Sequence, residues 1–327
     1  MTNLSTTFAG LKLKNPIIVS SSSLTDSPLK CKTLEENGAG AIVLKSIFEE
    51  QIMQQYDKWN DPENMDSNDY LETYLRSHSL NEYISLIQES KRCCSIPIIA
   101  SINCSTRSEW VTFARIAEEA GADALEVNIM EIQADIEYAY GSYEQKHIDI
   151  LSRIKRHTSL PIIMKLGQNL TNPIPLINQL YANGAKGIVL FNRSYRPDIN
   201  IDSHRFNAGE IWSRPGDICE ALRWIGISSA KVPNLSYAAS GGVHDGWGAV
   251  KALLAGASAA EVCTTLFWNG PQRIKVMKSQ IEEWMKGADY ERLSQFVGSM
   301  NLNSCSENEY YGRTQFMRYF SDYKDGR

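Results

Sequence analysis

The stretch Glu119–Val127, EAGADALEV, carries the pattern that predicts the fold of this chain. It holds the end of a helix, a Gly-Ala pair and a short apolar run. Glycine after a helix takes up the left-handed conformation that ends the helix at little cost. The same order recurs in ENGAGAIVL (36–44), ANGAKGIVL (182–190) and LAGASAAEV (254–262). These four segments predict four helices, each followed by a strand buried on both faces.

A second set of apolar runs alternates with the first. Each run starts at a proline, which a strand tolerates at its first residue. The runs are NPIIVSSS (15–22), IPIIASIN (96–103), LPIIMKLG (160–167) and VPNLSYAASGG (232–242), and amphipathic stretches separate them. Eight buried strands alternating with helices predict a (β/α)8 TIM barrel. A doubly wound open sheet is the alternative, and the pairwise repeat favours the closed ring.

Composition limits the class of protein. The chain has 327 residues, 43% hydrophobic and 22% charged, and a net charge of -5 that argues against nucleic acid or anionic membrane as a partner. We find no signal peptide, no apolar run long enough to cross a membrane, and no cysteine spacing typical of a metal site. We expect one cytoplasmic domain over 1–327. It would carry a long insertion at about 47–79 after the second strand and a helical extension at about 271–327.

Polar residues stand where the predicted strands end, and in a TIM barrel the C-terminal strand ends carry the site. Loops are polar in general, which accounts for any one of these residues. Two lysines and three asparagines at equivalent depth indicate a site instead, because buried charges and amides need partners. The set comprises Ser20, Ser21, Lys45, Ser46, Asn103, Asn128, Lys165, Asn192, Arg193, Ser240, Gly241, Gly242, Cys263, Thr264 and Thr265.

The segments SGGVHDGW (240–247) and TTLFWNGP (264–271) form the strongest local signal. Loops after the seventh and eighth barrel strands commonly bind phosphate through glycine amides and a helix N-terminus. Gly241 and Gly242 allow close approach of the backbone, and Thr264 and Thr265 offer hydroxyls. We therefore expect a phosphorylated cofactor or substrate.

Several motifs resemble the dihydroorotate dehydrogenase family over about residues 7–287. The similarity extends to its soluble class I branch and to the catalytic domain of dihydropyrimidine dehydrogenase. The motifs are TFAGLKLKNPIIVSSS (7–22), VLKSIFEE (43–50), ALEVNIM (124–130), PIIMKLG (161–167), GIVLFN (187–192) and the segment 240–271. The resemblance implies an FMN-dependent oxidoreductase of pyrimidine metabolism on a TIM barrel, and a homodimer.

The resemblance also implies roles for individual residues. Lys45 would lie by the flavin ring and the substrate and take part in catalysis, and Lys165 would stabilise negative charge on reduced flavin. Asn128 and Asn192 would bridge flavin and substrate. The remaining cofactor-binding positions would be Ser20, Ser21, Ser46, Asn103, Gly241, Gly242, Cys263 and Thr264.

The chain departs from the family pattern mainly on the substrate side. Glu131 stands where relatives carry a Cys or Ser base, and Cys263 replaces a glycine before the phosphate threonine. The segment after the second strand lacks an asparagine motif that helps to hold orotate. Glu131 is either the catalytic acid/base, with a pKa raised by desolvation, or a solvated loop residue.

Three functions therefore stay open. The first is hydride transfer between flavin N5 and a small dihydropyrimidine-like substrate. The second is a flavin-free lyase or isomerase that acts on a phosphorylated substrate. The third is a catalytically silent flavin-binding relative.

Overall fold

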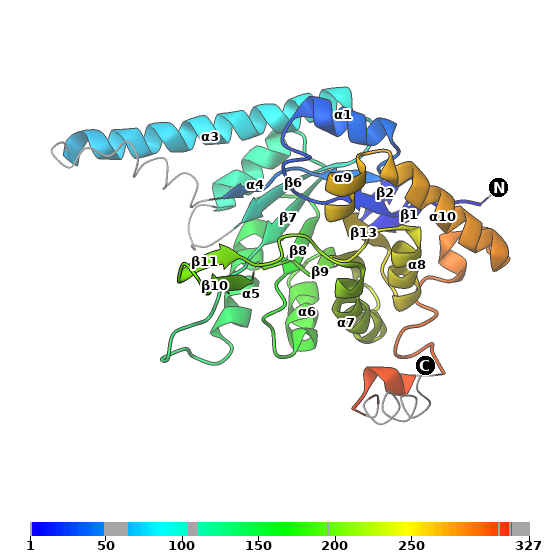
Figure 1. Ribbon diagram of the computed structural model, residues 1–327. Helices are drawn as coiled ribbons and strands as arrows, with labels where there is room; N and C mark the ends of the chain where they lie inside the picture. Colours follow the sequence, from blue (N-terminus) through cyan, green and yellow to red (C-terminus); the bar gives the residue numbers. More distant parts are fainter. Residues whose placement is uncertain are drawn as a thin grey trace.

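Eight parallel strands close into a barrel within the described part of a computed structural model of the chain (Figure 1). The structure describes residues 2–48, 65–103, 110–194, 196–306, 308–313 and 315. Strand β13 pairs with β3, β3 with β4, and β4 with β6, which closes the ring. The predicted TIM barrel is confirmed, and the open sheet is excluded. The barrel strands are β3 (Ile17–Val19), β4 (Ala41–Val43), β6 (Ile98–Asn103), β7 (Ala124–Asn128), β8 (Ile162–Leu166), β9 (Gly187–Leu190), β12 (Ser236–Ser240) and β13 (Ala259–Val262).

Helices surround the barrel, and their first residues explain where several begin. Ser27 and Asn172 accept hydrogen bonds from backbone amides in the first turns of α1 and α6, each of which starts at a proline. The helices are α1 (Pro28–Glu36), α3 (Met65–Cys93), α4 (Trp110–Glu119), α5 (Ser142–Lys155), α6 (Pro173–Ala182), α7 (Ile218–Lys231), α8 (Gly246–Ala255), α9 (Thr264–Asn269) and α10 (Arg273–Gly287), with short 3-10 turns η1 (Pro215–Asp217), η2 (Leu293–Gln295) and η3 (Asn308–Tyr311).

The interior of the barrel consists of two stacked layers. Alternate residues of a strand point to the same face, so residues two apart along a strand point inward one above the other. We call the "lower layer" the buried apolar set Ile18, Val43, Ile99, Ala124, Ile163, Val189, Ala238 and Ala259. We call the "upper layer" the residues two positions further along seven of these strands, which are Ser20, Lys45, Ser101, Glu126, Lys165, Ser240 and Glu261.

The lower end of the barrel is closed by the N-terminal hairpin β1 (Thr6–Phe8) and β2 (Leu11–Leu13). Phe8, Ala9 and Leu13 of this hairpin belong to the same apolar cluster as the lower layer. Because the lower end is plugged with apolar side chains, the barrel interior is open only toward the C-terminal ends of the strands.

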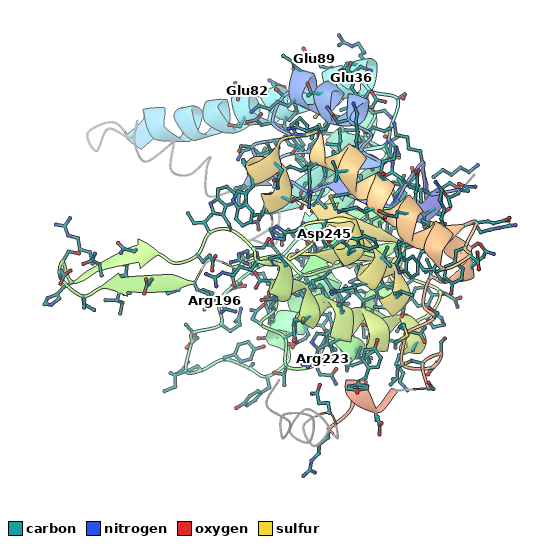
Figure 2. All side chains as sticks on the ribbon, turned by 45° about the vertical axis from the view of Figure 1, so that its right-hand side comes forward. Glu36, Glu82, Glu89, Arg196, Arg223 and Asp245 are labelled. Atoms are coloured by element: carbon teal, nitrogen blue, oxygen red, sulfur yellow. The ribbon has the colours of Figure 1, made fainter. Side chains whose placement is uncertain are left out.

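Two elements project from the barrel. Helix α3 extends well beyond it, and the hairpin of β10 (Pro197–Asn200) and β11 (Arg205–Ala208) also stands out from the barrel body (Figures 1 and 2). The predicted insertion at about 47–79 contains β5 (Ile47–Phe48) and the first half of α3, and its residues 49–64 lie outside the described residues. The described part of the predicted extension holds α10, η2 and η3. Across the described ranges, no helix combines the length and apolar character needed to cross a membrane.

Candidate functional site

A cavity of about 460 Å³ opens at the C-terminal strand ends. Volumes of this size are typical of sites for cofactors and small ligands. Of the residues predicted for the site, those that line the cavity are Ser20, Ser21, Lys45, Ser46, Asn103, Asn128, Lys165, Asn192, Gly241, Gly242, Cys263 and Thr264. Residues from strands far apart in the sequence therefore meet in one place. Arg193 and Ser240 line it as well, whereas Glu131 and Thr265 do not.

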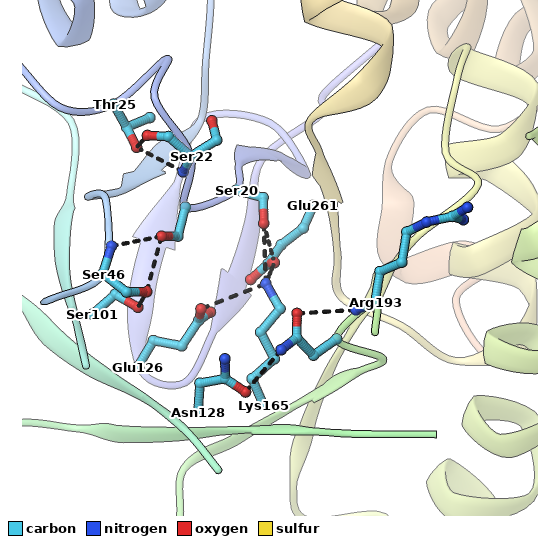
Figure 3. Close-up of polar contacts among 12 residues, drawn as sticks. Ser20, Ser22, Thr25, Ser46, Ser101, Glu126, Asn128, Lys165, Arg193 and Glu261 are labelled. Atoms are coloured by element: carbon cyan, nitrogen blue, oxygen red, sulfur yellow. Dashed lines mark hydrogen bonds and ion pairs between the residues drawn. The ribbon is translucent and has the colours of Figure 1, made fainter. Parts of the chain in front are cut away.

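The floor of the cavity holds a buried ionic cluster formed by Glu126, Lys165 and Glu261 (Figure 3). The Lys165 ammonium lies 2.6 Å from a Glu261 carboxylate oxygen and 3.5 Å from a Glu126 oxygen. Ser20 joins the cluster, since its hydroxyl donates to Glu261 at 2.9 Å and accepts from Lys165 at 3.0 Å. The three charged side chains are at most 6% exposed. Such burial is tolerated only where charges are paired.

Burial and neighbouring charge push the pKa values of the cluster apart. Burial, followed by repulsion from Glu261, holds the pKa of Glu126 well above its usual range. Burial also acts to raise the pKa of Glu261, but Lys165 and hydrogen bonds outweigh it and hold that pKa below its usual range. Burial opposes the charge of Lys165, yet the two carboxyls together raise its pKa. These directions favour charge on Lys165 and Glu261 and oppose it on Glu126.

Hydroxyl groups connect the wall of the cavity to the barrel interior. Ser46 bonds to Ser21 at 3.0 Å and to Ser101 at 2.7 Å. Tyr83 from α3 donates to the Ser101 carbonyl and accepts from the Ser101 amide. This network fixes the strand ends that carry Ser21 and Ser46.

Amide side chains and a lysine face one another at the mouth. Asn192 donates to the Asn128 side-chain oxygen at 3.1 Å and contacts the Met130 sulfur at 3.5 Å. The Lys45 side chain lines the same space, and its ammonium has no carboxylate partner within the part of the chain that the structure describes. Amides both donate and accept, so this wall suits a ligand with alternating N–H and C=O groups.

The opposite end of the cavity has the features of a phosphate site. Gly241 and Gly242 both have positive φ, at 89° and 77°, and a side chain on Gly242 would collide with the backbone at Ile218. Glycine is thus required there to bring this turn against the start of α7. Thr264 begins α9, and its hydroxyl accepts from the Ser213 amide at 3.2 Å.

Glu131 points away from the cavity. Its carboxylate pairs with Lys146 of α5 at 2.6 Å, and the side chain is 47% exposed. The neighbouring Met130 lines the cavity instead. The loop start is held by Asn169, which donates to the Glu131 carbonyl, and by Tyr143, which donates to the Ile129 carbonyl. The acid/base role of Glu131 stays a prediction.

Arg193 secures a loop and leaves little of its guanidinium for a ligand. It pairs with Asp217 and donates to the carbonyls of Glu210 and Trp212. Arg196 is exposed at the base of the β10–β11 hairpin, away from the cavity lining (Figure 2).

Sequence reasoning missed three polar residues of the site, Glu126, Glu261 and Ser213. It also missed the apolar lining, which includes Phe48, Phe191 and Phe267. The signal for the two glutamates was present, because each interrupts a run of apolar residues in a strand buried on both faces. A carboxyl in such a strand needs a cation beside it. Ser213 had no comparable signal, since a long loop brings it to Thr264.

Comparison with known proteins finds one matching family and two types of relative. The family model described as dihydroorotate dehydrogenase matches residues 3–285. The chain is 27% identical over 316 residues to the dihydroorotate dehydrogenase B (NAD(+)) catalytic subunit of Thermoplasma volcanium, covering 91% of this chain and 98% of that protein. It is 28% identical over 304 residues to the corresponding subunit of Pyrococcus horikoshii, covering 88% and 95%.

A second type of relative is also similar. The chain is 24% identical over 327 residues to the NAD-dependent dihydropyrimidine dehydrogenase subunit PreA of Escherichia coli, covering 92% of this chain and 77% of that protein. The two types of relative are named for different reactions, so similarity alone does not select a substrate.

Proposed function

This chain belongs to the dihydroorotate dehydrogenase family, and on that premise we propose that it is an FMN-dependent oxidoreductase. Flavin N5 would exchange hydride with a small dihydropyrimidine-like substrate. One observation carries the proposal: a single cavity combines three kinds of group. Glycines and hydroxyls lie at one end, a lysine lies at the floor, and amide side chains form a wall. Each part would suit a different portion of FMN or of its substrate.

The residues of the cavity fit FMN. Gly241, Gly242 and Thr264 would hold the phosphate through backbone amides and a hydroxyl. Lys165 would meet the polar edge of the flavin ring at the floor, with Ser20 and Ser21 along one side. FMN supplies the two-electron chemistry when bound, and the protein orients it and sets its charge environment. Ser46, Asn103 and Cys263 line the same space.

The substrate side is supported by Asn128, Asn192 and Lys45. Their amides and ammonium match the N–H and C=O groups of a cyclic amide. Lys45 would also act in catalysis beside the flavin. Glu131 would serve as acid/base only after its ion pair with Lys146 opens and its loop moves over the cavity. A homodimer and a cytoplasmic location stay predictions.

Anaerobic reduction of the FMN-loaded protein tests this proposal. Dihydroorotate is compared with uncharged dihydropyrimidines, and bleaching of the visible flavin band is followed. We expect one member of the panel to bleach the flavin. A protein that takes up no FMN would support the flavin-free alternative, and an FMN-loaded protein that none of them bleaches would support the silent one.

The role of Glu131 needs its own variant. If it is the acid/base, E131Q slows flavin reduction by the identified substrate while FMN binding stays unchanged. General acid–base catalysis contributes about 10²–10⁴-fold, so the loss should lie in that range. Unchanged reduction would show that Glu131 is not the base.

A further inference from the structure

The floor of the cavity contains more negative than positive groups. Glu126 and Glu261 both approach Lys165, and among the described residues no second cation forms an ion pair with either carboxyl. Lys45, the other lysine of the upper layer, lines the same cavity without pairing with them. If both carboxyls were ionised, the cluster would carry a net negative charge where water cannot screen it. Uncompensated charge of this kind is strongly unfavourable in a protein interior.

Two oxygens of the cluster are buried without a hydrogen-bond partner, Glu126 Oε2 and Glu261 Oε1. The groups that face the cluster from neighbouring elements are the hydroxyls of Ser20 and Tyr83 and the thiol of Cys263. Burial raises the pKa of the tyrosine and of the cysteine, so neither supplies a negative or positive charge. A proton is the counter-charge that remains.

We infer that Glu126, Lys165 and Glu261 form a positioning site that holds one proton on its two carboxyls, so that Lys165 reaches the bound ligand with its charge already compensated. Two carboxyls that share one proton are a known arrangement where like charges lie close together. They titrate as a pair, so the proton belongs to the cluster. The identity of the ligand rests on the proposed function, whereas the protonation is a property of the chain alone.

This inference changes the role expected for Lys165. A lysine without a counter-charge beside the flavin would favour negative charge on the reduced form. A lysine paired with Glu261 at 2.6 Å favours it less. The two glutamates would therefore lower the reduction potential of bound FMN relative to a site with lysine alone.

Infrared spectroscopy of the FMN-free protein tests the shared proton. The wild type at neutral pH should show the C=O stretch of one buried protonated carboxyl. Both E126Q and E261Q should lack the band, because the carboxyl that remains ionises beside Lys165. E131Q, which changes a half-exposed carboxylate, is the matched control and should keep it.

Three results would overturn the inference. They are absence of the band from the wild type, its persistence in both single variants, and its loss in E126Q alone. In the last case Glu126 would be neutral through burial alone. Since the measurement needs no FMN, failure of the protein to bind FMN would refute the proposed function and leave this result intact.

The reduction potential tests the effect on the flavin. At a pH low enough to keep Lys165 protonated without its carboxyl partners, the FMN-loaded double variant E126Q/E261Q leaves the ammonium without a counter-charge, so its potential should lie above that of the wild type. Each single variant keeps one carboxylate and should stay near the wild type. A double variant with an unchanged potential would overturn the compensation of Lys165.

Discussion

The two layers of the barrel interior are built from the same strands yet differ in every chemical respect. The lower layer is fully apolar and is sealed by the N-terminal hairpin. The upper layer, two residues further on, holds two lysines, two glutamates and three serines. Strands β7, β8 and β13 each contribute one residue to both layers. The lower-layer and upper-layer residues are Ala124 and Glu126 on β7, Ile163 and Lys165 on β8, and Ala259 and Glu261 on β13.

This difference shows where stability and function are separated in the fold. The lower layer excludes water and gains stability from packing. The upper layer accepts the cost of buried charge in order to present polar groups to a ligand. Substitutions in the two layers should therefore differ in magnitude, in pH dependence and in their effect on FMN.

The largest effect is expected from Lys165→Met. Removing the cation leaves two buried carboxyls without a partner, and breaking a buried pair in this way costs about 3–5 kcal/mol. The free energy of unfolding from urea denaturation measures the loss. The control is K186M, at an exposed lysine, which should change it by less than about 0.5 kcal/mol. Equal stability of the two variants would show that the upper layer does not depend on this ion pair.

The next effect concerns pH and the raised pKa of Glu126. Because its folded pKa is raised, its contribution to stability is fully present below the ordinary carboxyl range. That contribution is lost as the pH rises toward the folded pKa, at up to about 1.4 kcal/mol per pH unit for one proton. Unfolding free energies of the wild type should fall in this window, and those of E126Q should fall less. Parallel pH profiles would contradict a raised pKa of Glu126.

A smaller effect is expected in the lower layer. Ile163→Val removes one buried methylene group directly below Lys165 and should cost about 0.5–1.5 kcal/mol. The loss should be independent of pH, and FMN affinity should be unchanged. A loss that varies with pH would show that the two layers are coupled.

The smallest effect is expected at the half-exposed pair Lys146–Glu131. Ion pairs of this kind contribute about 0–1 kcal/mol, so K146M should change the free energy of unfolding within that range. If the Glu131 loop moves over the cavity during turnover, K146M should also alter the rate of flavin reduction. Unchanged kinetics would show that this ion pair does not restrain the loop.

Much of the barrel was predictable because the residues that end its helices and begin its strands act locally. Glycine at helix ends and proline at strand starts have fixed conformational consequences, so the eight strands follow from the sequence. The ends of the strands then identify Lys45, Lys165 and the asparagines. The face of each strand that points into the barrel is harder to predict from the sequence, because strands buried on both faces are apolar throughout. For this reason Glu126 and Glu261 were counted with the apolar runs and were not recognised as site residues.

The path of a loop is harder still to predict. Glu131 follows Asn128 by three residues, which places it near the mouth by count alone. In the structure the loop turns so that Met130 faces the cavity and Glu131 meets α5. A surface ion pair contributes too little energy for its presence in the sequence to predict the path of a loop.

The cavity above the lower layer is expected to bind FMN by its phosphate end and its lysine floor. Titration of the FMN-free protein with FMN, followed by flavin fluorescence, tests it directly. Thr264→Val removes a hydroxyl from the phosphate end, and a hydrogen bond to a charged group contributes about 1.5–3 kcal/mol. We predict saturable binding by the wild type and by T33V, a control on α1, and binding about 10–100-fold weaker by T264V. Wild-type protein that binds no FMN, or equal affinity of T264V and wild type, would contradict the claim.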